Sequence, residues 1–154
     1  ASQVSDGAAA VVLMTRRKAK ELGCPIMGVF RSFAVVGVPP HVMGIGPAYA
    51  IPAALEQCGL TSDDIDVFEI NEAFASQALM SINHLKLPID KVNPNGGAIA
   101  LGHPLGCTGA RQVSTLLNEL ERQRDAKKDN KPRYGMISMC IGSGMGAASV
   151  LVRE

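Results

Sequence analysis

The sequence has no long apolar segment, no excess of charge of either sign and no paired cysteines. No apolar run approaches the roughly 20 residues that a membrane-spanning helix needs, and the formal net charge is only +1. The composition therefore indicates no membrane span, and neither nucleic acid nor an anionic membrane surface as a partner. With 154 residues, of which 47% are hydrophobic and 19% charged, the chain can bury the core of one globular domain.

The cysteines and histidines are too scattered to indicate a metal site. None of the four cysteines belongs to a Cys-x-x-Cys pair, and the three histidines do not cluster with them at ligand spacing. The residues concerned are Cys24, Cys58, Cys107 and Cys140, together with His41, His84 and His103. We therefore expect no zinc site. We also expect no disulfide framework, because a chain of this size and apolar content needs no covalent staples.

The first residues do not resemble the start of a complete protein. The chain begins with Ala1 instead of Met. Residues 1–10 contain neither the basic region nor the apolar region of a signal peptide. We therefore expect the chain to be part of a longer protein.

Strands and helices are predicted to alternate along the chain. Short apolar or alternating runs predict strands, and the first run is continuously apolar, as in a strand buried on both faces. The predicted strands span residues 8–14, 26–38, 65–70, 134–139 and 147–152. Helices are predicted over residues 15–22 and 49–58, and apolar stripes at helical spacing predict two more over residues 75–85 and 113–120.

This alternation predicts an α/β fold with a mixed, mainly parallel sheet between layers of helices. The last two strands are joined by a short glycine-containing loop, and we expect them to form an antiparallel hairpin at one edge of the sheet. In sheets of this kind, ligands bind at strand ends and helix starts. Three segments place reactive or orienting side chains at such positions.

The first segment is Asn71-Glu-Ala-Phe74, directly after the predicted strand over residues 65–70. The sequence alone also allows a purely structural interpretation. Asn71 is a suitable helix cap, and Phe74 is a suitable core residue. The segment therefore becomes a functional candidate only in combination with others.

The second segment runs from Gly97 to Gly109, with His103 near its centre. So many glycines indicate a backbone that bends tightly or lies close to another group. A histidine just before a helix feels the positive end of the helix dipole, which favours a neutral imidazole able to accept or donate a proton. By itself, a single histidine is more often structural.

The third segment is Cys140-Ile-Gly-Ser-Gly-Met-Gly146, between the last two predicted strands. A cysteine at a strand end, followed by glycine turns, can lie beside bare backbone N–H groups, as an oxyanion hole requires. A buried thiol before a hairpin turn explains it equally well. The glycine spacing approximates a dinucleotide-binding loop, but the chain after Ala147 is predicted to be a strand, which leaves no room for the necessary helix.

Taken in this order, the three segments resemble the three C-terminal motifs of the thiolase family. The matching stretches are Asn71-Glu-Ala-Phe, Asn95-Gly-Gly-Ala-Ile-Ala-Leu-Gly-His-Pro and Cys140-Ile-Gly-Ser-Gly-Met-Gly. The resemblance covers essentially the whole chain. The amino-acid sequence around His103 and Cys140 is most similar to that of the peroxisomal 3-ketoacyl-CoA thiolases. It implies that residues 1–24 end an N-terminal thiolase half and that residues 25–154 form the C-terminal domain.

The resemblance implies an acyltransferase of fatty acid β-oxidation. Such enzymes cleave a 3-ketoacyl-CoA with coenzyme A, giving acetyl-CoA and a shortened acyl-CoA. Coenzyme A is then a substrate, and no covalently bound cofactor is expected. The implied location is the peroxisome, with mitochondrion or cytosol as alternatives. The implied partners are an N-terminal thiolase half and a second copy in a homodimer.

Four residues match catalytic positions of the family. Cys140 matches the cysteine that moves the proton on the α-carbon of acetyl-CoA. His103 matches the histidine that activates the nucleophilic cysteine and helps to bind the enolate oxygen, and Asn71 matches the residue that positions a water in that oxyanion hole. The N–H of Gly142 matches a donor of the second hole. Family analogy also places Ser2, Met43 and Phe74 against the pantetheine arm of coenzyme A.

The resemblance is incomplete, because the family's nucleophilic cysteine motif and its lysine-rich nucleotide loop are missing. Cys24, Cys58 and Cys107 do not match the nucleophile's context. We therefore expect this chain alone to be inactive.

Several related functions remain as alternatives. One is a biosynthetic acetyl-CoA acetyltransferase, and another is a non-catalytic partner that binds coenzyme A or completes a dimer. Cys140 argues against a β-ketoacyl-ACP synthase, which normally has a histidine there. Asn71 argues against the sterol-carrier type of thiolase, which replaces the Asn-Glu-Ala-Phe motif.

Overall fold

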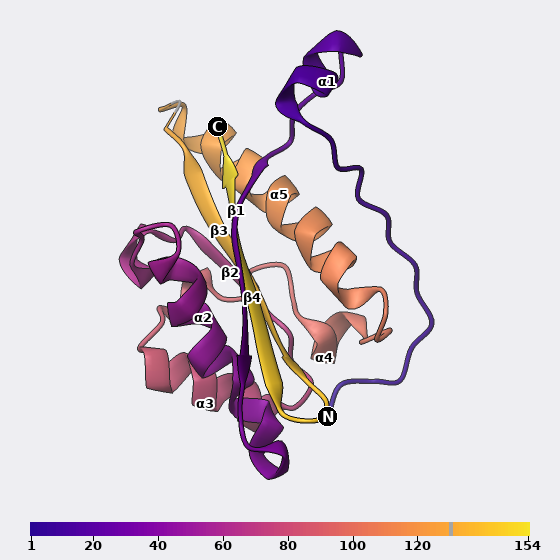
Figure 1. Cartoon of the computed structure of the whole chain (residues 1–154), viewed down its shortest axis with the longest axis vertical. Helices are drawn as coiled ribbons and strands as arrows, with labels where there is room; N and C mark the ends of the chain where they lie inside the picture. Colours follow the sequence, from indigo (N-terminus) through magenta and orange to yellow (C-terminus); the bar gives the residue numbers. More distant parts are fainter. Residues whose placement is uncertain (130) are drawn as a thin grey trace.

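A four-stranded sheet in the order β1-β4-β3-β2 forms the centre of the computed structural model (Figure 1), which describes residues 1–129 and 131–154. The strands are β1 (Val29–Gly37), β2 (Val67–Ile70), β3 (Arg133–Ile141) and β4 (Met145–Arg153). Strand β2 pairs parallel with β3, whereas β4 is antiparallel to both β3 and β1. The predicted mixed sheet and the β3–β4 hairpin are therefore confirmed.

Two details of the predicted sheet are wrong. The hairpin lies in the middle of the sheet, and two of the three strand pairings in the described residues are antiparallel. The reason is that β1 covers the open edge of β4 along almost its whole length, from Val29 opposite Val152 to Gly37 opposite Met145. An uncovered edge would leave the polar backbone groups of β4 without partners.

Helices cover both faces of the sheet, as predicted. Helices α2 (Gly46–Glu56) and α3 (Ala75–Leu85) lie on one face, and the long helix α5 (Thr108–Lys127) lies on the other (Figure 1). Shorter elements complete the chain: α1 (Arg16–Glu21), α4 (Ala98–Leu101) and the 3-10 helices η1 (Pro40–Ile45), η2 (Ser62–Asp64) and η3 (Ile89–Lys91).

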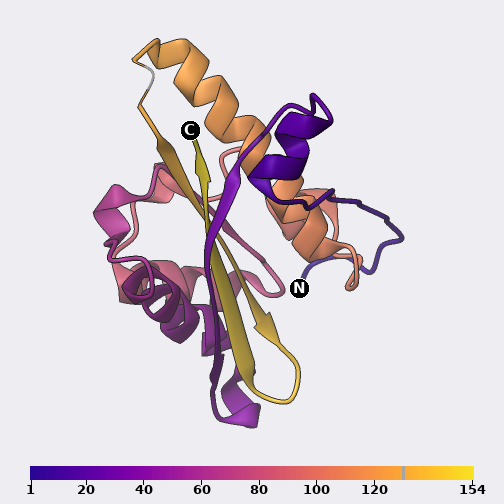
Figure 2. The same ribbon diagram turned by 45° about the horizontal axis from the view of Figure 1, so that its top comes forward.

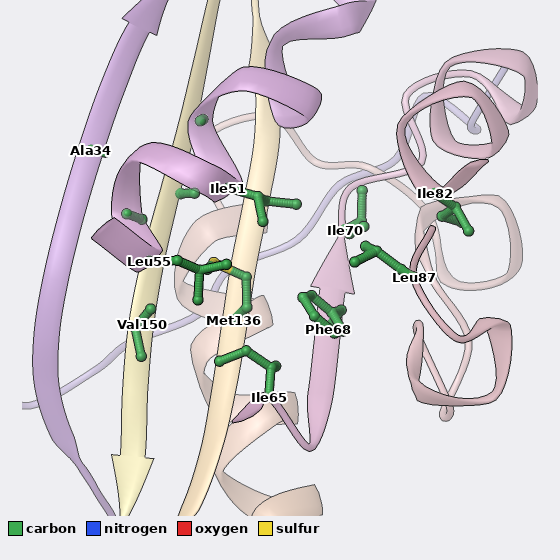
Figure 3. Close-up of a cluster of buried hydrophobic side chains, with 13 residues drawn as sticks. Ala34, Ile51, Leu55, Ile65, Phe68, Ile70, Ile82, Leu87, Met136 and Val150 are labelled. Atoms are coloured by element: carbon green, nitrogen blue, oxygen red, sulfur yellow. The ribbon is translucent and has the colours of Figure 1, made fainter. Parts of the chain in front are cut away.

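Each face of the sheet has its own apolar cluster, because side chains alternate along a strand. On the α2 side, Ile51 and Leu55 pack with Phe68 and Met136 (Figure 3). On the α5 side, the cluster consists of Val67, Leu116, Leu117, Leu120 and Leu151. Every residue of β2 is consequently buried, including the charged residue Glu69.

The strand predicted over residues 8–14 is not formed. Residues 1–14 have no regular secondary structure, and the side chains of Val12 and Leu13 are each 81% exposed. The segment runs outside the sheet on the α5 side before it enters α1 (Figures 1 and 2). An apolar run forms a strand only where a neighbouring strand satisfies its backbone groups, and the described residues place none beside it.

Helix α2 begins directly against the β3–β4 hairpin, because two glycines meet there. A Cβ atom on Gly146 would lie 2.2 Å from the carbonyl oxygen of Gly46. A Cβ atom on Gly46 would lie 2.6 Å from the carbonyl oxygen of Met145. The start of α2 can therefore lie this close to the hairpin only if both positions lack a side chain.

Replacing Gly146 with Ala should lower the free energy of unfolding by about 3 kcal/mol, because the new methyl group overlaps rigid backbone. The matched control is Gly37→Ala on β1, where a Cβ atom would have nothing within 4 Å. That variant should change the stability by less than about 1 kcal/mol. Urea denaturation followed by circular dichroism measures both effects. Equal losses in the two variants would contradict the close glycine contact.

Candidate active site

The predicted site segments meet at the carboxyl end of the parallel β2–β3 pair. Asn71 follows β2 directly, and its backbone N–H donates a hydrogen bond of 2.8 Å to the carbonyl oxygen of Ser138 on β3. Cys140 lies two residues further along β3, near the end of that strand. The Cys140 side chain is half-buried, and burial raises the pKa of its thiol. A raised pKa keeps this thiol protonated at neutral pH.

The side chain of Asn71 contacts the imidazole of His103. Asn71 Nδ2 lies 3.3 Å from His103 Nε2. The prediction that Asn71 caps the following helix is wrong, because α3 begins only at Ala75, four residues later, with Phe74 at its N-cap position. The intervening residues leave the Asn71 amide free to face His103. Its Oδ1 atom is buried and accepts no hydrogen bond from the described residues.

The hydrogen bonds around His103 are consistent with one tautomer of a neutral imidazole. The Thr108 hydroxyl donates to the carbonyl oxygen of Pro104 at 3.2 Å, so its oxygen can accept from His103 Nδ1 at 2.6 Å. Nδ1 then carries the proton, and the lone pair of Nε2 faces the Asn71 amide. Burial lowers the pKa of His103, and the positive charge of Arg111 lowers it further. Both effects favour the neutral imidazole that the sequence analysis expects.

Gly142 lies in the exposed turn that joins β3 to β4. A Cβ atom there would have nothing within 4 Å, so the space beside its Cα is open. The next two residues have left-handed conformations, with φ of +68° at Ser143 and +90° at Gly144. The Gly144 carbonyl oxygen accepts a hydrogen bond of 2.9 Å from the Val38 N–H, which anchors the turn to the end of β1.

The three residues expected to contact coenzyme A also lie close together. Met43 and Phe74 line one cavity of about 340 Å³ between η1 and α3, together with Gln77 and Met80. Phe74 is 43% exposed, so its interpretation as a core residue is wrong. Ser2 donates backbone and side-chain hydrogen bonds to the carbonyl oxygen of Ala73, at 3.0 and 3.4 Å, next to Phe74.

A buried ion pair beneath the site was missed by the sequence analysis. Glu69 on β2 is fully buried, and its Oε2 atom lies 2.9 Å from Arg111 Nη1 on α5. Its Oε1 atom has no hydrogen-bond partner among the described residues. Burial outweighs the attraction of Arg111 and raises the pKa of Glu69 to about 7. The signal in the sequence was an acidic residue inside a strand that is otherwise apolar.

Gln112 ties the start of α5 to both strands of the site. Its Nε2 group donates to the carbonyl oxygens of Glu69 and Ser138, at 2.9 and 3.3 Å. Gln112 is fully buried. Two further residues that the sequence analysis missed, Glu72 and Asn93, join the loops above the sheet and are considered below.

The chain is similar to known proteins over most of its length. A family model described as "Thiolase, C-terminal domain" matches residues 24–153. The chain belongs to the thiolase family. Thiolase relatives include the rat protein "3-ketoacyl-CoA thiolase B, peroxisomal", 70% identical over 97% of this chain and 34% of that protein. The human "3-ketoacyl-CoA thiolase, peroxisomal" is 68% identical over the same shares.

Solved structures of thiolases have the same fold. The peroxisomal 3-ketoacyl-CoA thiolase of Saccharomyces cerevisiae, described as five-layered with two core domains of identical topology, matches with a TM-score of 0.82 and 57% identity. The match covers 90% of this chain and 38% of that one. A second structure of the yeast thiolase, described as dimeric, also gives 0.82. The chain spans about a third of the length of the curated thiolases that it matches.

No helix in residues 1–129 and 131–154 combines the length and apolar character that crossing a membrane requires. Within the same residues, no group of three or more His, Cys, Asp or Glu side chains is arranged to hold a metal ion.

Glu69 should make the stability of this thiolase domain pH-dependent. Its pKa of about 7 in the folded protein lies above the ordinary value of 4.5, so the folded state holds the proton more tightly than the unfolded state. The free energy of unfolding should therefore fall as pH rises from about 4.5 to 7, by at most about 3 kcal/mol. Urea denaturation at several pH values should show this fall in the unmodified protein.

The variant Glu69→Gln should lack this contribution, because a glutamine does not titrate. The matched control is Glu56→Gln, at an exposed position on α2, which should preserve the fall. Parallel stability curves for the unmodified protein and Glu69→Gln would show that Glu69 is ionised throughout this pH range.

Proposed function

We propose that this chain supplies the acid/base and oxyanion groups of a 3-ketoacyl-CoA thiolase. The whole enzyme would cleave a 3-ketoacyl-CoA with coenzyme A into acetyl-CoA and a shortened acyl-CoA, in peroxisomal fatty acid β-oxidation. The observation that carries the proposal is the contact between Asn71 and His103 at the same sheet end as Cys140. The names of the relatives support the substrate class and the location.

His103 is suited to two successive tasks. Its Nε2 lone pair can accept the proton of a nucleophilic thiol, and the resulting thiolate attacks the 3-keto carbonyl carbon. The bond between the α- and β-carbons then breaks, and its electron pair passes to the acetyl-CoA enolate. The Nε2–H group can now donate a hydrogen bond to the enolate oxygen, while Nδ1 stays hydrogen-bonded to Thr108. Asn71 adds an amide beside the same nitrogen, and its unsatisfied Oδ1 can hold a water.

Cys140 completes the proton balance. Its thiol protonates the α-carbon of the enolate and releases acetyl-CoA. The remaining Cys140 thiolate takes the proton from the thiol of an incoming coenzyme A, which attacks the acyl-enzyme thioester. The nucleophilic cysteine leaves as a thiolate and takes back the proton held on His103 Nε2, so that both groups return to their starting states. The exposed N–H of Gly142 is the proposed donor to the oxygen of that thioester and of its tetrahedral intermediate. The raised pKa of Cys140 suits the first of these steps, because the group must begin as a thiol.

Coenzyme A is proposed as a substrate that lies along the cavity between η1 and α3. Met43 and Phe74 offer apolar surface to the pantetheine arm, and Ser2 offers a hydroxyl beside them. A cavity with apolar walls and few polar groups suits such a chain, because the contacts orient it without demanding many hydrogen bonds.

The nucleophilic cysteine is proposed to come from an N-terminal thiolase half, to which residues 1–24 belong and which residues 25–154 complete as the C-terminal domain. The exposed apolar run over residues 8–14 supports this division, because it lacks a neighbouring strand in the described chain. A homodimer is proposed from the dimeric yeast relative.

The purified chain alone should not cleave acetoacetyl-CoA with added coenzyme A, because it has the proton-transfer groups without the nucleophile. The measurement is disappearance of acetoacetyl-CoA, with circular dichroism to show that the chain is folded. Adding a separately expressed N-terminal half should restore turnover. Turnover by the chain alone would mean that one of its own cysteines performs the attack.

In the full-length enzyme, Cys140→Ala should reduce kcat by about 10²- to 10⁴-fold, the usual contribution of a general acid/base group. The fold should survive, because only a half-buried sulfur is lost. Cys58→Ala is the matched control, since Cys58 lies just after α2 and its thiol contacts carbonyl groups of that helix. Unchanged turnover of Cys140→Ala would contradict its assignment as the acid/base.

A further inference from the structure

The carboxylate of Glu72 links two loops that approach the candidate site. Its Oε1 atom accepts a hydrogen bond of 3.1 Å from Asn93 Nδ2, and its Oε2 atom accepts one of 3.0 Å from the backbone N–H of Ile99. Glu72 itself follows Asn71 in the chain. One side chain therefore joins the loop after β2 to Asn93, which precedes the glycine-rich segment, and to Ile99 within that segment.

Asn93 forms the fixed end of this link. Its side-chain amide accepts a hydrogen bond of 2.8 Å from the N–H of Ile70 and donates one of 2.9 Å to the carbonyl oxygen of the same residue. Its backbone N–H donates to the carbonyl oxygen of Phe68 at 2.8 Å. Asn93 thus continues the sheet beyond β2, and Glu72 is held against a rigid element.

The short helix α4 forms the other end. It has four residues, too few to be stable without tertiary contacts, and it ends directly before Gly102 and His103. Glu72 accepts a hydrogen bond from the Ile99 N–H, one of the groups that the first turn of a helix leaves without a partner. Gly97 makes room for this contact, because a Cβ atom there would lie 2.4 Å from Glu72 Cδ.

We propose that Glu72 is a positioning residue that sets the location of His103 relative to Asn71. The proposal rests on the proposed function for the roles of Asn71 and His103. Glu72 is covalently adjacent to Asn71 and hydrogen-bonded to the helix that leads into His103. These contacts form a closed loop of neighbouring residues, from Asn71 through Glu72 and α4 to His103. The loop holds His103 Nε2 3.3 Å from Asn71 Nδ2.

Two variants of the full-length enzyme disrupt the contacts of the Glu72 carboxylate in different ways. Glu72→Gln keeps the size of the side chain but replaces one acceptor oxygen with a donor, so one of the two hydrogen bonds is lost. Gly97→Ala keeps every charge and pushes the carboxylate aside. Both should lower kcat by about 10- to 100-fold, the scale expected for misplaced catalytic groups, and should change KM by less than about threefold.

The matched control is Glu119→Gln. Glu119 on α5 accepts a hydrogen bond of 2.9 Å from Asn95 Nδ2, so it also anchors the glycine-rich segment, but without contact to Glu72 or Asn93. This variant should keep kcat within about twofold. An equal loss in all three variants would overturn the proposal, because it would indicate general loosening of the segment.

A second readout follows His103 directly, by NMR titration of its ring in the full-length enzyme. In Gly97→Ala, where no charge changes, displacement of His103 from its buried position should raise its pKa toward the ordinary value. An unchanged pKa in that variant would overturn the proposal. If His103→Ala retained thiolysis while Gly97→Ala still raised this pKa, the proposed function would fail and the positioning by Glu72 would stand.

Discussion

The parallel pairing of β2 with β3 is the contact on which the geometry of the site depends. Ile70 pairs with Ser138, and the Asn71 N–H continues the ladder to Ser138. Because the two strands point the same way, the residues that follow them emerge at the same end of the sheet. Gln112 bonds to a carbonyl oxygen of each strand, so α5 and the His103 segment before it are aligned on the same pair.

A buried ion pair between Glu69 and Arg111 lies beneath the site. A buried ion pair contributes little to stability, because desolvation offsets its attraction, but loss of one partner is strongly destabilising. Here the positive charge of Arg111 helps to lower the pKa of His103. The arrangement favours a neutral imidazole without a charged group in contact with it.

Most elements and the three site segments were predictable because they depend on local chemistry. The apolar stripe of α5, the apolar runs of β3 and β4 and the glycine turn between them all follow from periodicity. The strand order did not, because nothing local distinguishes an edge hairpin from one whose outer strand is covered by β1. Residues 8–14 have the composition of a strand, yet composition cannot supply the neighbour that a strand needs.

The same distinction explains which site residues were found. His103 and Cys140 are reactive types in unusual glycine contexts, so the sequence marks them by themselves. Glu69, Glu72 and Asn93 act through contacts with residues distant in the chain, such as the 2.9 Å contact of Glu69 with Arg111. Asn71 combines both kinds. Its position after a strand suggested a helix cap, and only the delayed start of α3 shows that its amide faces His103.

Burial favours the neutral forms of Cys140 and His103, the two groups proposed to transfer protons. It raises the pKa of the Cys140 thiol and lowers that of the His103 imidazole, because a low-dielectric environment disfavours whichever form is charged. Both groups are therefore neutral before reaction, one ready to give a proton and the other ready to accept one. Any further domain that covers this end of the sheet would exclude more water and shift both pKa values further in the same directions. Completing the site from another part of the protein would thus strengthen the protonation states that the acid and the base already have.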